Sequence, residues 1–161
     1  TEIDVDTANA MRMLERASRD IQRRGWDFNT YNITLSPDAY TGRIAWIPTI
    51  ISFKADDGGT YVKRGDHFYN NTEQTFTFTR GIQITAIMAV DFEDLPDAFR
   101  NYIAARAAVD FQARFMGDTA IAQDLALSLQ EAYQDIVDYD MHMGDYNMLT
   151  YIGVTPALER S

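Results

Sequence analysis

The sequence contains no cysteine and only two histidines, His67 and His142. Without cysteine, the chain can form no disulfide, no thiol nucleophile and no thiolate metal site. The two histidines are far apart and show none of the ligand spacings of metal motifs, and phosphate-binding loops such as GxGxxG are absent. We therefore predict neither a metal nor an organic cofactor.

Long apolar runs are also missing. No run reaches the roughly 18 residues that a transmembrane helix requires, and no signal-peptide pattern is present. Hydrophobic residues nevertheless make up 46% of the 161 residues, so the chain can bury a core and is not intrinsically disordered. We expect a soluble globular domain and, because the sequence does not begin with Met, a processed form or a fragment.

Basic residues are scarce. The chain has 14 Lys and Arg against 24 Asp and Glu, a formal net charge of −10. Affinity for nucleic acid comes mainly from Lys and Arg that neutralise phosphates. A surface that binds nucleic acid is therefore not expected.

Apolar residues recur at helical spacing in three segments. The first helix is predicted from Asp6 or Thr7 to Arg24, where Gly25 supplies a left-handed cap. A second helix begins near Pro96 and ends at Gly117; it is apolar almost all round and should be central in its bundle. A third begins at Asp118 or Thr119, and its apolar stripe contains Ile121, Leu125, Leu129, Ala132, Ile136, Tyr139 and Met143.

Between Trp26 and Asp94 the pattern changes from helical to alternating. Seven strands are predicted: Thr30 to Leu35, Arg43 to Ile47, Ile50 to Lys54, Tyr61 to Arg64, Phe68 to Asn71, Gln74 to Thr79 and Ile82 to Asp91. The predicted fold class is α+β, an antiparallel bundle of long helices interrupted by a small antiparallel β subdomain. Residues 1–28 and 95–149 form the bundle, residues 29–94 the β-rich insert, and residues 150–161 a C-terminal tail without periodicity.

Two of the helices carry opposite charges on their polar sides. The first has Arg12, Arg16, Arg19 and Arg23 opposite its apolar residues, and we call this set the arginine face. The third has seven acids and no Lys or Arg between Asp118 and Asp145. Four of them follow one line along the helix, the acidic stripe of Asp124, Glu131, Asp135 and Asp138. The stripe is a solvated face, a partner for the arginine face in the same or a neighbouring subunit, or the wall of a channel through which DNA slides.

The second helix also carries charges, Arg106, Asp110 and Arg114, at i, i+4 and i+8. They form either an ordinary row of helical ion pairs or a row that docks a neighbouring protomer or fixes the register of the bundle. In the β-rich insert, the carboxylates of Asp57, Asp66 and Glu73 are candidates for a glycoside-hydrolysing acid–base pair. Such pairs are common in acidic proteins, so this is the alternative function and not the main prediction.

Several short motifs occur together in a fixed order along the chain. They are Thr7-Ala8-Asn9-Ala10 with Leu14, Ile21-Gln22 with Arg24-Gly25-Trp26 and Phe28-Asn29, Ile33-Thr34-Leu35 with Pro37-Asp38 and Tyr40, Tyr61-Val62 with Arg64-Gly65 and Tyr69, Asp94 to Arg100, Arg114-Phe115 with Gly117, and Gly144 with Tyr146-Asn147-Met148-Leu149. In this order and spacing the chain resembles tail tubular protein A, the head-to-tail adaptor of short-tailed bacteriophages. The resemblance covers roughly Asp6 to Met148.

The resemblance implies a non-enzymatic structural protein of the virion tail, assembled in the host cytoplasm as a ring, a dodecamer in this family. The ring joins the portal protein to the tail nozzle, a protein of the tail tubular protein B type. It encloses the channel through which double-stranded DNA passes without specific binding during packaging, retention and ejection. The family has a further N-terminal helix before the position of Thr1, which this sequence lacks.

On this basis we expect the arginine face and the acidic stripe to form the contacts between subunits. We expect Tyr146, Asn147, Met148 and Leu149 to form the portal interface. A third interpretation is an interaction module, unrelated to phage, that binds a basic partner through the acidic helix.

Overall fold

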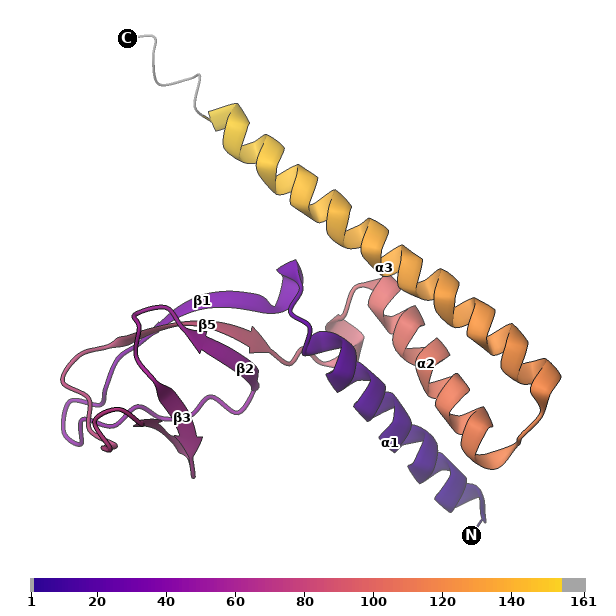
Figure 1. Ribbon diagram of the computed structural model, residues 1–161, viewed down its shortest axis with the longest axis horizontal. Helices are drawn as coiled ribbons and strands as arrows, with labels where there is room; N and C mark the ends of the chain where they lie inside the picture. Colours follow the sequence, from indigo (N-terminus) through magenta and orange to yellow (C-terminus); the bar gives the residue numbers. More distant parts are fainter. Residues whose placement is uncertain (1, 155–161) are drawn as a thin grey trace. The chain divides into compact units, whose positions relative to one another are not determined.

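The computed structural model describes the backbone of residues 2–154 and the side chains of residues 5–144. This part of the chain has the predicted α+β fold, with three long helices and small antiparallel sheets (Figure 1). It divides into two compact units, a helical unit of residues 1–21 and 91–161 and a β-rich unit of residues 22–90.

The first helix, α1 (Glu2–Gln22), begins earlier than predicted and ends two residues sooner. The earlier start agrees with the helix dipole, because Asp6 places a negative charge near the positive end of the helix. The end is set by Gly25, which has φ +76° and donates its N–H to the carbonyl of Gln22. This positive φ strains any residue with a side chain, and a Cβ at Gly25 would also lie 2.8 Å from the end of the Ile87 side chain, so glycine is strongly favoured there.

Helices α2 (Asp97–Phe115) and α3 (Thr119–Val154) are antiparallel neighbours, and α2 lies between α1 and α3 (Figure 1). The connection is capped by Asp118, whose carboxylate accepts the N–H groups of Ala120 and Ile121. Helix α3 continues five residues beyond Leu149, so the tail predicted from residue 150 is helical to Val154, and residues 155–161 lie outside the described part.

The core of the helical unit follows the predicted apolar faces. Met13, Ala17 and Ile21 of α1 are buried, as are Phe99, Tyr102, Ile103 and Ala107 of α2 and Ala132 and Ile136 of α3. Aromatic pairs join α2 to α3: the ring centroids of Phe99 and Tyr139, and those of Tyr102 and Tyr133, are each 5.8 Å apart. The apolar stripe predicted for α3 therefore faces α2, although the first residue of that stripe, Ile121, remains exposed.

The β-rich unit contains a three-stranded antiparallel sheet in the order β1-β5-β2 and a hairpin of β3 and β4. The strands are β1 (Thr30–Leu35), β2 (Ile50–Ala55), β3 (Tyr61–Arg64), β4 (His67–Asn70) and β5 (Ile82–Met88). In β5, Ile82, Ile84 and Ala86 are buried on one face, as the alternation predicts.

Two of the seven predicted strands are wrong. Residues 43–47 and 74–79 are extended only locally, and each makes a single β-bridge, Ala45 with His67 and Thr75 with Asn70. The first segment runs into Pro48, which has no N–H to donate to a ladder. The second begins at Gln74, whose φ of +53° interrupts the extended backbone.

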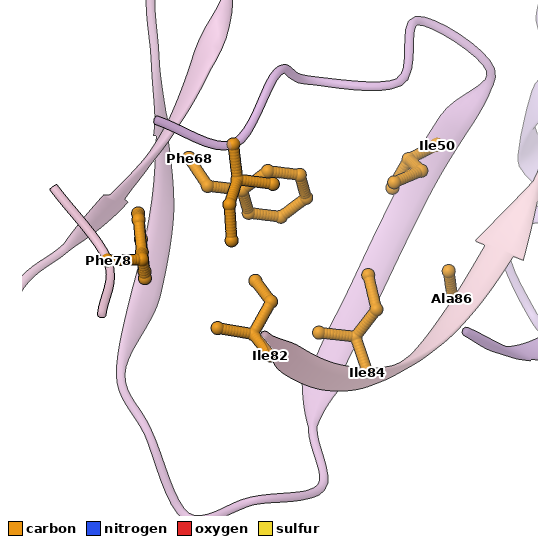
Figure 2. Close-up of a cluster of buried hydrophobic side chains, with 7 residues drawn as sticks. Ile50, Phe68, Phe78, Ile82, Ile84 and Ala86 are labelled. Carbon is orange, nitrogen blue, oxygen red and sulfur yellow. The ribbon is translucent and has the colours of Figure 1, made fainter. Parts of the chain in front are cut away.

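Seven buried side chains form the core of the β-rich unit (Figure 2). They are Ile44, Ile50, Phe68, Phe78, Ile82, Ile84 and Ala86. Phe68 is completely buried, and its ring centroid lies 4.9 Å from that of Trp46 and 5.4 Å from that of Phe53. Aromatic packing of this kind joins the hairpin strand β4 to strand β2 and to the segment around Trp46.

The two ends of the β-rich unit are tied together by buried amides. The side chain of Gln22 donates to the carbonyl of Val90 (3.0 Å) and accepts from its N–H (2.7 Å). Asn29 donates to the carbonyls of Gln22 (3.0 Å) and Met88 (3.2 Å) and accepts from the N–H of Trp26 (2.8 Å). The entry and exit of the unit are therefore adjacent.

Candidate interaction surfaces

The acidic stripe lies on the outer side of α3. Asp124, Glu131, Asp135 and Asp138 are all exposed, while Ala132 and Ile136 on the opposite side are buried. In the described part of the chain none of the four forms an ion pair, and Asp138 accepts only a hydrogen bond from Gln134 (3.0 Å). The stripe is a run of exposed, uncompensated negative charge.

The arginine face is exposed as well. Arg12, Arg16 and Arg19 lie on the solvent side of α1, and Arg23 follows it at the start of the β-rich unit. Arg16 pairs with Asp20 of the same helix at 3.8 Å, and both side chains are more than 60% exposed, so this pair stabilises the helix by at most about 1 kcal/mol. Of the alternatives for the acidic stripe, pairing with α1 of the same subunit has no ion pair in its favour in the described part, where each ion pair joins residues of one helix.

Charged residues of α2 lie beside the arginine face in the structure. Arg12 and Arg16 of α1 and Asp110 and Arg114 of α2 line one hollow of about 260 Å³, with Met13 beneath and Phe115 at the rim. The Asp110 carboxylate is engaged by Arg106 at 3.4 Å, so the row predicted on α2 is in part an intrahelical ion pair. Three guanidinium groups from two helices thus line the same hollow as one carboxylate that already has a partner.

A second hollow beside α1 is almost entirely apolar. It has a volume of about 410 Å³ and a floor of small residues from α2, including Ala104, Ala107 and Ala108. Its walls come from α1 and from the start of α3, where Ile121 and Leu125 contribute, and Met116 at its edge is 63% exposed. The prediction that α2 is central holds, but one of its faces remains open. Exposed apolar surface of this kind is typical of interaction sites.

The predicted portal residues Tyr146, Asn147, Met148 and Leu149 belong to the helical backbone of α3. Their side chains lie outside the described residues. Their role remains a prediction.

Charge is distributed unevenly between the two units. The helical unit has seven Lys and Arg against 18 Asp and Glu, a formal charge of −11, whereas the β-rich unit has seven against six, a charge of +1. The acidic character of the chain thus belongs to the helices alone. A basic partner would be attracted to the helical unit, and the β-rich unit would not repel an acidic one.

The carboxylates considered for sugar hydrolysis are used in turns. Asp57 accepts hydrogen bonds from the N–H of Gly59 (3.0 Å), the hydroxyl of Tyr61 (2.9 Å) and the N–H of Gln83 (3.2 Å). Burial raises the pKa of Asp57, but these hydrogen bonds to its carboxylate outweigh that effect. The pKa is therefore below its ordinary value of 3.8. A general acid in glycoside hydrolysis needs a raised pKa, so Asp57 does not suit that role.

Tyr61 shares this turn. Burial raises the pKa of its hydroxyl, and the hydrogen bond to the Asp57 carboxylate raises it further. A Cβ at Gly59 would lie 2.1 Å from the Tyr61 ring, so only glycine lets the turn close over the tyrosine. The arrangement is that of a structural turn. Of the other two carboxylates, Glu73 accepts from the Asn70 side chain (3.2 Å) and Asp66 is exposed in the β3–β4 turn.

We expect Asp57→Asn to reduce the acid sensitivity of the β-rich unit. The pKa of Asp57 is lower in the folded than in the unfolded chain, so its carboxylate stabilises the fold above the ordinary value of 3.8, and this contribution is lost as pH falls through the folded pKa. The stability of the wild-type protein should therefore fall more steeply below about pH 4 than that of the variant. Urea unfolding at a series of pH values measures this. Asp66→Asn is the control, and equal slopes for Asp57→Asn and the wild type would contradict the assignment.

Two further properties concern the described part of the chain. No helix there combines the length and apolar character of a membrane span. No group of three His, Cys, Asp or Glu side chains converges there as a metal site requires.

Comparison with known proteins identifies a family. A family model described as Tail tubular protein matches residues 1–146. A search of curated proteins gave no significant match. The matched range includes α1, the whole β-rich unit, α2 and most of α3, and therefore both the arginine face and the acidic stripe.

Proposed function

Because the chain belongs to the tail tubular protein family and is thus a structural component of a phage tail, we propose that it is the subunit of the adaptor ring between the portal protein and the nozzle protein. In this proposal identical subunits, a dodecamer as the resemblance implies, enclose the DNA exit channel. The ring holds the genome after packaging and releases it at ejection. Tyr146 to Leu149 at the end of α3 contact the portal protein, and a nozzle protein binds another surface of the ring.

The observation that carries the proposal is the pair of unlike faces on the helical unit. A head-to-tail ring needs two different, complementary surfaces on every subunit, because each subunit uses one surface toward each neighbour. The acidic stripe on α3 and the hollow with Arg12, Arg16 and Arg114 are such a pair. Neither is neutralised by the other within the described part of one chain.

The free energies of the available interactions favour a subunit interface of several weak contacts over one with a single strong contact. An exposed ion pair contributes about 0–1 kcal/mol, so a single Arg–Asp pair cannot hold a ring together. The arginine face and the acidic stripe each offer four charges, and the apolar hollow of about 410 Å³ offers surface whose burial is favourable. Charge then determines which faces meet, and apolar burial supplies much of the stability.

We expect Arg16→Glu to raise the concentration needed for assembly at least about tenfold, because it places like charges in every subunit contact. Native mass spectrometry of the protein, with and without portal protein, measures the ring. Arg80→Glu, which reverses an exposed arginine of the β-rich unit, is the matched control, and circular dichroism verifies that both variants fold. The second-site change Glu131→Arg should restore part of the assembly.

Two outcomes would contradict these assignments. Unchanged assembly of Arg16→Glu with portal would remove the arginine face from the subunit contact. A wild-type protein that forms no ring and binds no portal under any condition would overturn the adaptor function itself.

A further inference from the structure

Two arginines of the β-rich unit flank a pair of aromatic rings that contact each other edge to face. The Arg64 guanidinium carbon lies 3.7 Å from the centroid of the Tyr69 ring. The Tyr69 and Phe76 centroids are 4.8 Å apart in an edge-to-face arrangement, and Arg43 lies 5.6 Å from the Phe76 centroid. We call this set of four residues the arginine–ring row.

The fold holds the row in place. Strands β3 and β4 pair Val62 with Tyr69 and Arg64 with His67, so Arg64 and Tyr69 are diagonal neighbours on one face of the hairpin. The bridge of Asn70 with Thr75 returns the chain so that Phe76 meets Tyr69. Tyr69 is only 8% exposed, so the ring on which Arg64 stacks is fixed.

Both guanidinium groups remain available. Arg43 and Arg64 are exposed, and in the described part of the chain neither side chain forms an ion pair or a hydrogen bond. Stacking occupies one planar face of a guanidinium and leaves the N–H groups at its edge free. An arginine fixed in this way loses less conformational entropy on binding than a free one, and desolvated arginines and aromatics are frequent hot spots of protein interfaces.

The chemistry of the row favours carboxylates over nucleic acid. Binding of single strands relies on exposed rings on which bases stack, but here one ring is buried and both carry a guanidinium. Duplex binding requires a line of cations along many phosphates, whereas the unit has a charge of only +1. Lys63 does not extend the row, because it alternates with Arg64 along β3 and its amine lies 5.2 Å from the Trp46 ring centroid.

We propose that the arginine–ring row binds an acidic peptide segment of a second protein, with two carboxylates accepting hydrogen bonds from Arg43 and Arg64. The inference rests on the proposed adaptor function only in that an adaptor must bind a protein other than itself. In this inference the β-rich unit contacts the other protein, and the arginine face forms the contacts between subunits.

The test uses a labelled oligo-glutamate peptide and fluorescence anisotropy at low ionic strength. We expect the wild-type protein to bind it and the double variant Arg43→Gln/Arg64→Gln to bind at least about tenfold more weakly, a loss of about 1.4 kcal/mol. Arg80→Gln removes one exposed arginine of the same unit that is not in the row, and it should bind as the wild type does. Arg43→Lys/Arg64→Lys keeps the charge and loses the planar stacked group, so it should bind with intermediate affinity.

Several results would overturn the proposal. One is that the wild type does not bind oligo-glutamate, and another is that Arg80→Gln loses as much affinity as the double glutamine variant. A third is that a labelled DNA oligonucleotide binds more tightly than oligo-glutamate. The last is a melting temperature of the double glutamine variant well below that of Arg80→Gln. Tighter binding of a peptide with the sequence of residues 118–143 would assign the row to a second copy of this chain and would equally overturn it.

Native mass spectrometry separates this inference from the adaptor function. The double glutamine variant should form rings as the wild type does, and loss of rings would make the row a subunit contact and overturn the inference. If the wild type forms no ring but binds oligo-glutamate through Arg43 and Arg64, the adaptor function fails and the acidic-peptide site remains.

Discussion

We expect Phe68→Ala to lower the free energy of unfolding by about 3–5 kcal/mol, the usual cost of removing a fully buried phenylalanine. Phe68 is 0% exposed and belongs to the buried core of the β-rich unit (Figure 2). Its ring packs against the rings of Trp46 and Phe53, which also contact each other. Alanine at this position leaves a cavity that neither the hairpin nor the sheet can fill. Urea unfolding followed by tryptophan fluorescence measures the change, because Trp46 is part of the same cluster.

Tyr40→Ala is the matched control for this measurement. Tyr40 is 98% exposed, so its removal should change the free energy of unfolding by less than about 0.5 kcal/mol. A loss in Phe68→Ala as small as that in the control would show that the hairpin of β3 and β4 does not share a core with the sheet.

Asn29→Ala should have the second largest effect, about 2–4 kcal/mol. Asn29 is 0% exposed and makes three hydrogen bonds to the backbone, at Gln22, Met88 and Trp26. Alanine would leave two carbonyls and one N–H without this partner inside the protein, and each buried unsatisfied group costs about 1–3 kcal/mol. Asn29→Asp should also destabilise, because the two donor hydrogen bonds are lost and a carboxylate is placed beside carbonyl oxygens.

Asn32→Ala separates this effect from the loss of any asparagine. Asn32 is exposed on β1 and accepts one hydrogen bond from the Thr85 hydroxyl, so its replacement should cost less than about 1 kcal/mol. Thermal unfolding by calorimetry compares the variants. Equal losses for Asn29→Ala and Asn32→Ala would contradict the assignment of Asn29 as the residue that joins the ends of the unit.

Periodicity in the sequence predicted the helices and strands that have one regular apolar face. The three helices, the buried face of β5 and the paired strands β1, β2, β3 and β4 were located to within a few residues. Residues 43–47 and 74–79 were predicted as strands because their side chains alternate, but alternation describes only which side a residue faces. Whether a segment joins a ladder depends on its neighbours, and Pro48 and Gln74 prevent it here.

The same distinction applies to the surfaces. The acidic stripe lies on one helix, and the arginine face lies on α1 and the turn directly after it, so spacing along the sequence was sufficient to find both. The hollow with Arg12, Arg16 and Arg114 unites two helices, and the arginine–ring row unites a hairpin with two loops. Such groups depend on tertiary contacts that one sequence does not specify. Gln22 and Asn29 likewise stand out in the sequence only as parts of a motif, because a polar residue near a glycine that ends a helix gives no sign that it will be buried.

The amides of Gln22 and Asn29 hold the first and last residues of the β-rich unit beside each other. A segment whose ends meet can be removed or exchanged without stretching the chain on either side. A short turn in place of residues 22–90 would then join Ile21 directly to Asp91. The fold therefore permits the segment between these two positions to be lengthened, shortened or replaced while the three helices stay as they are.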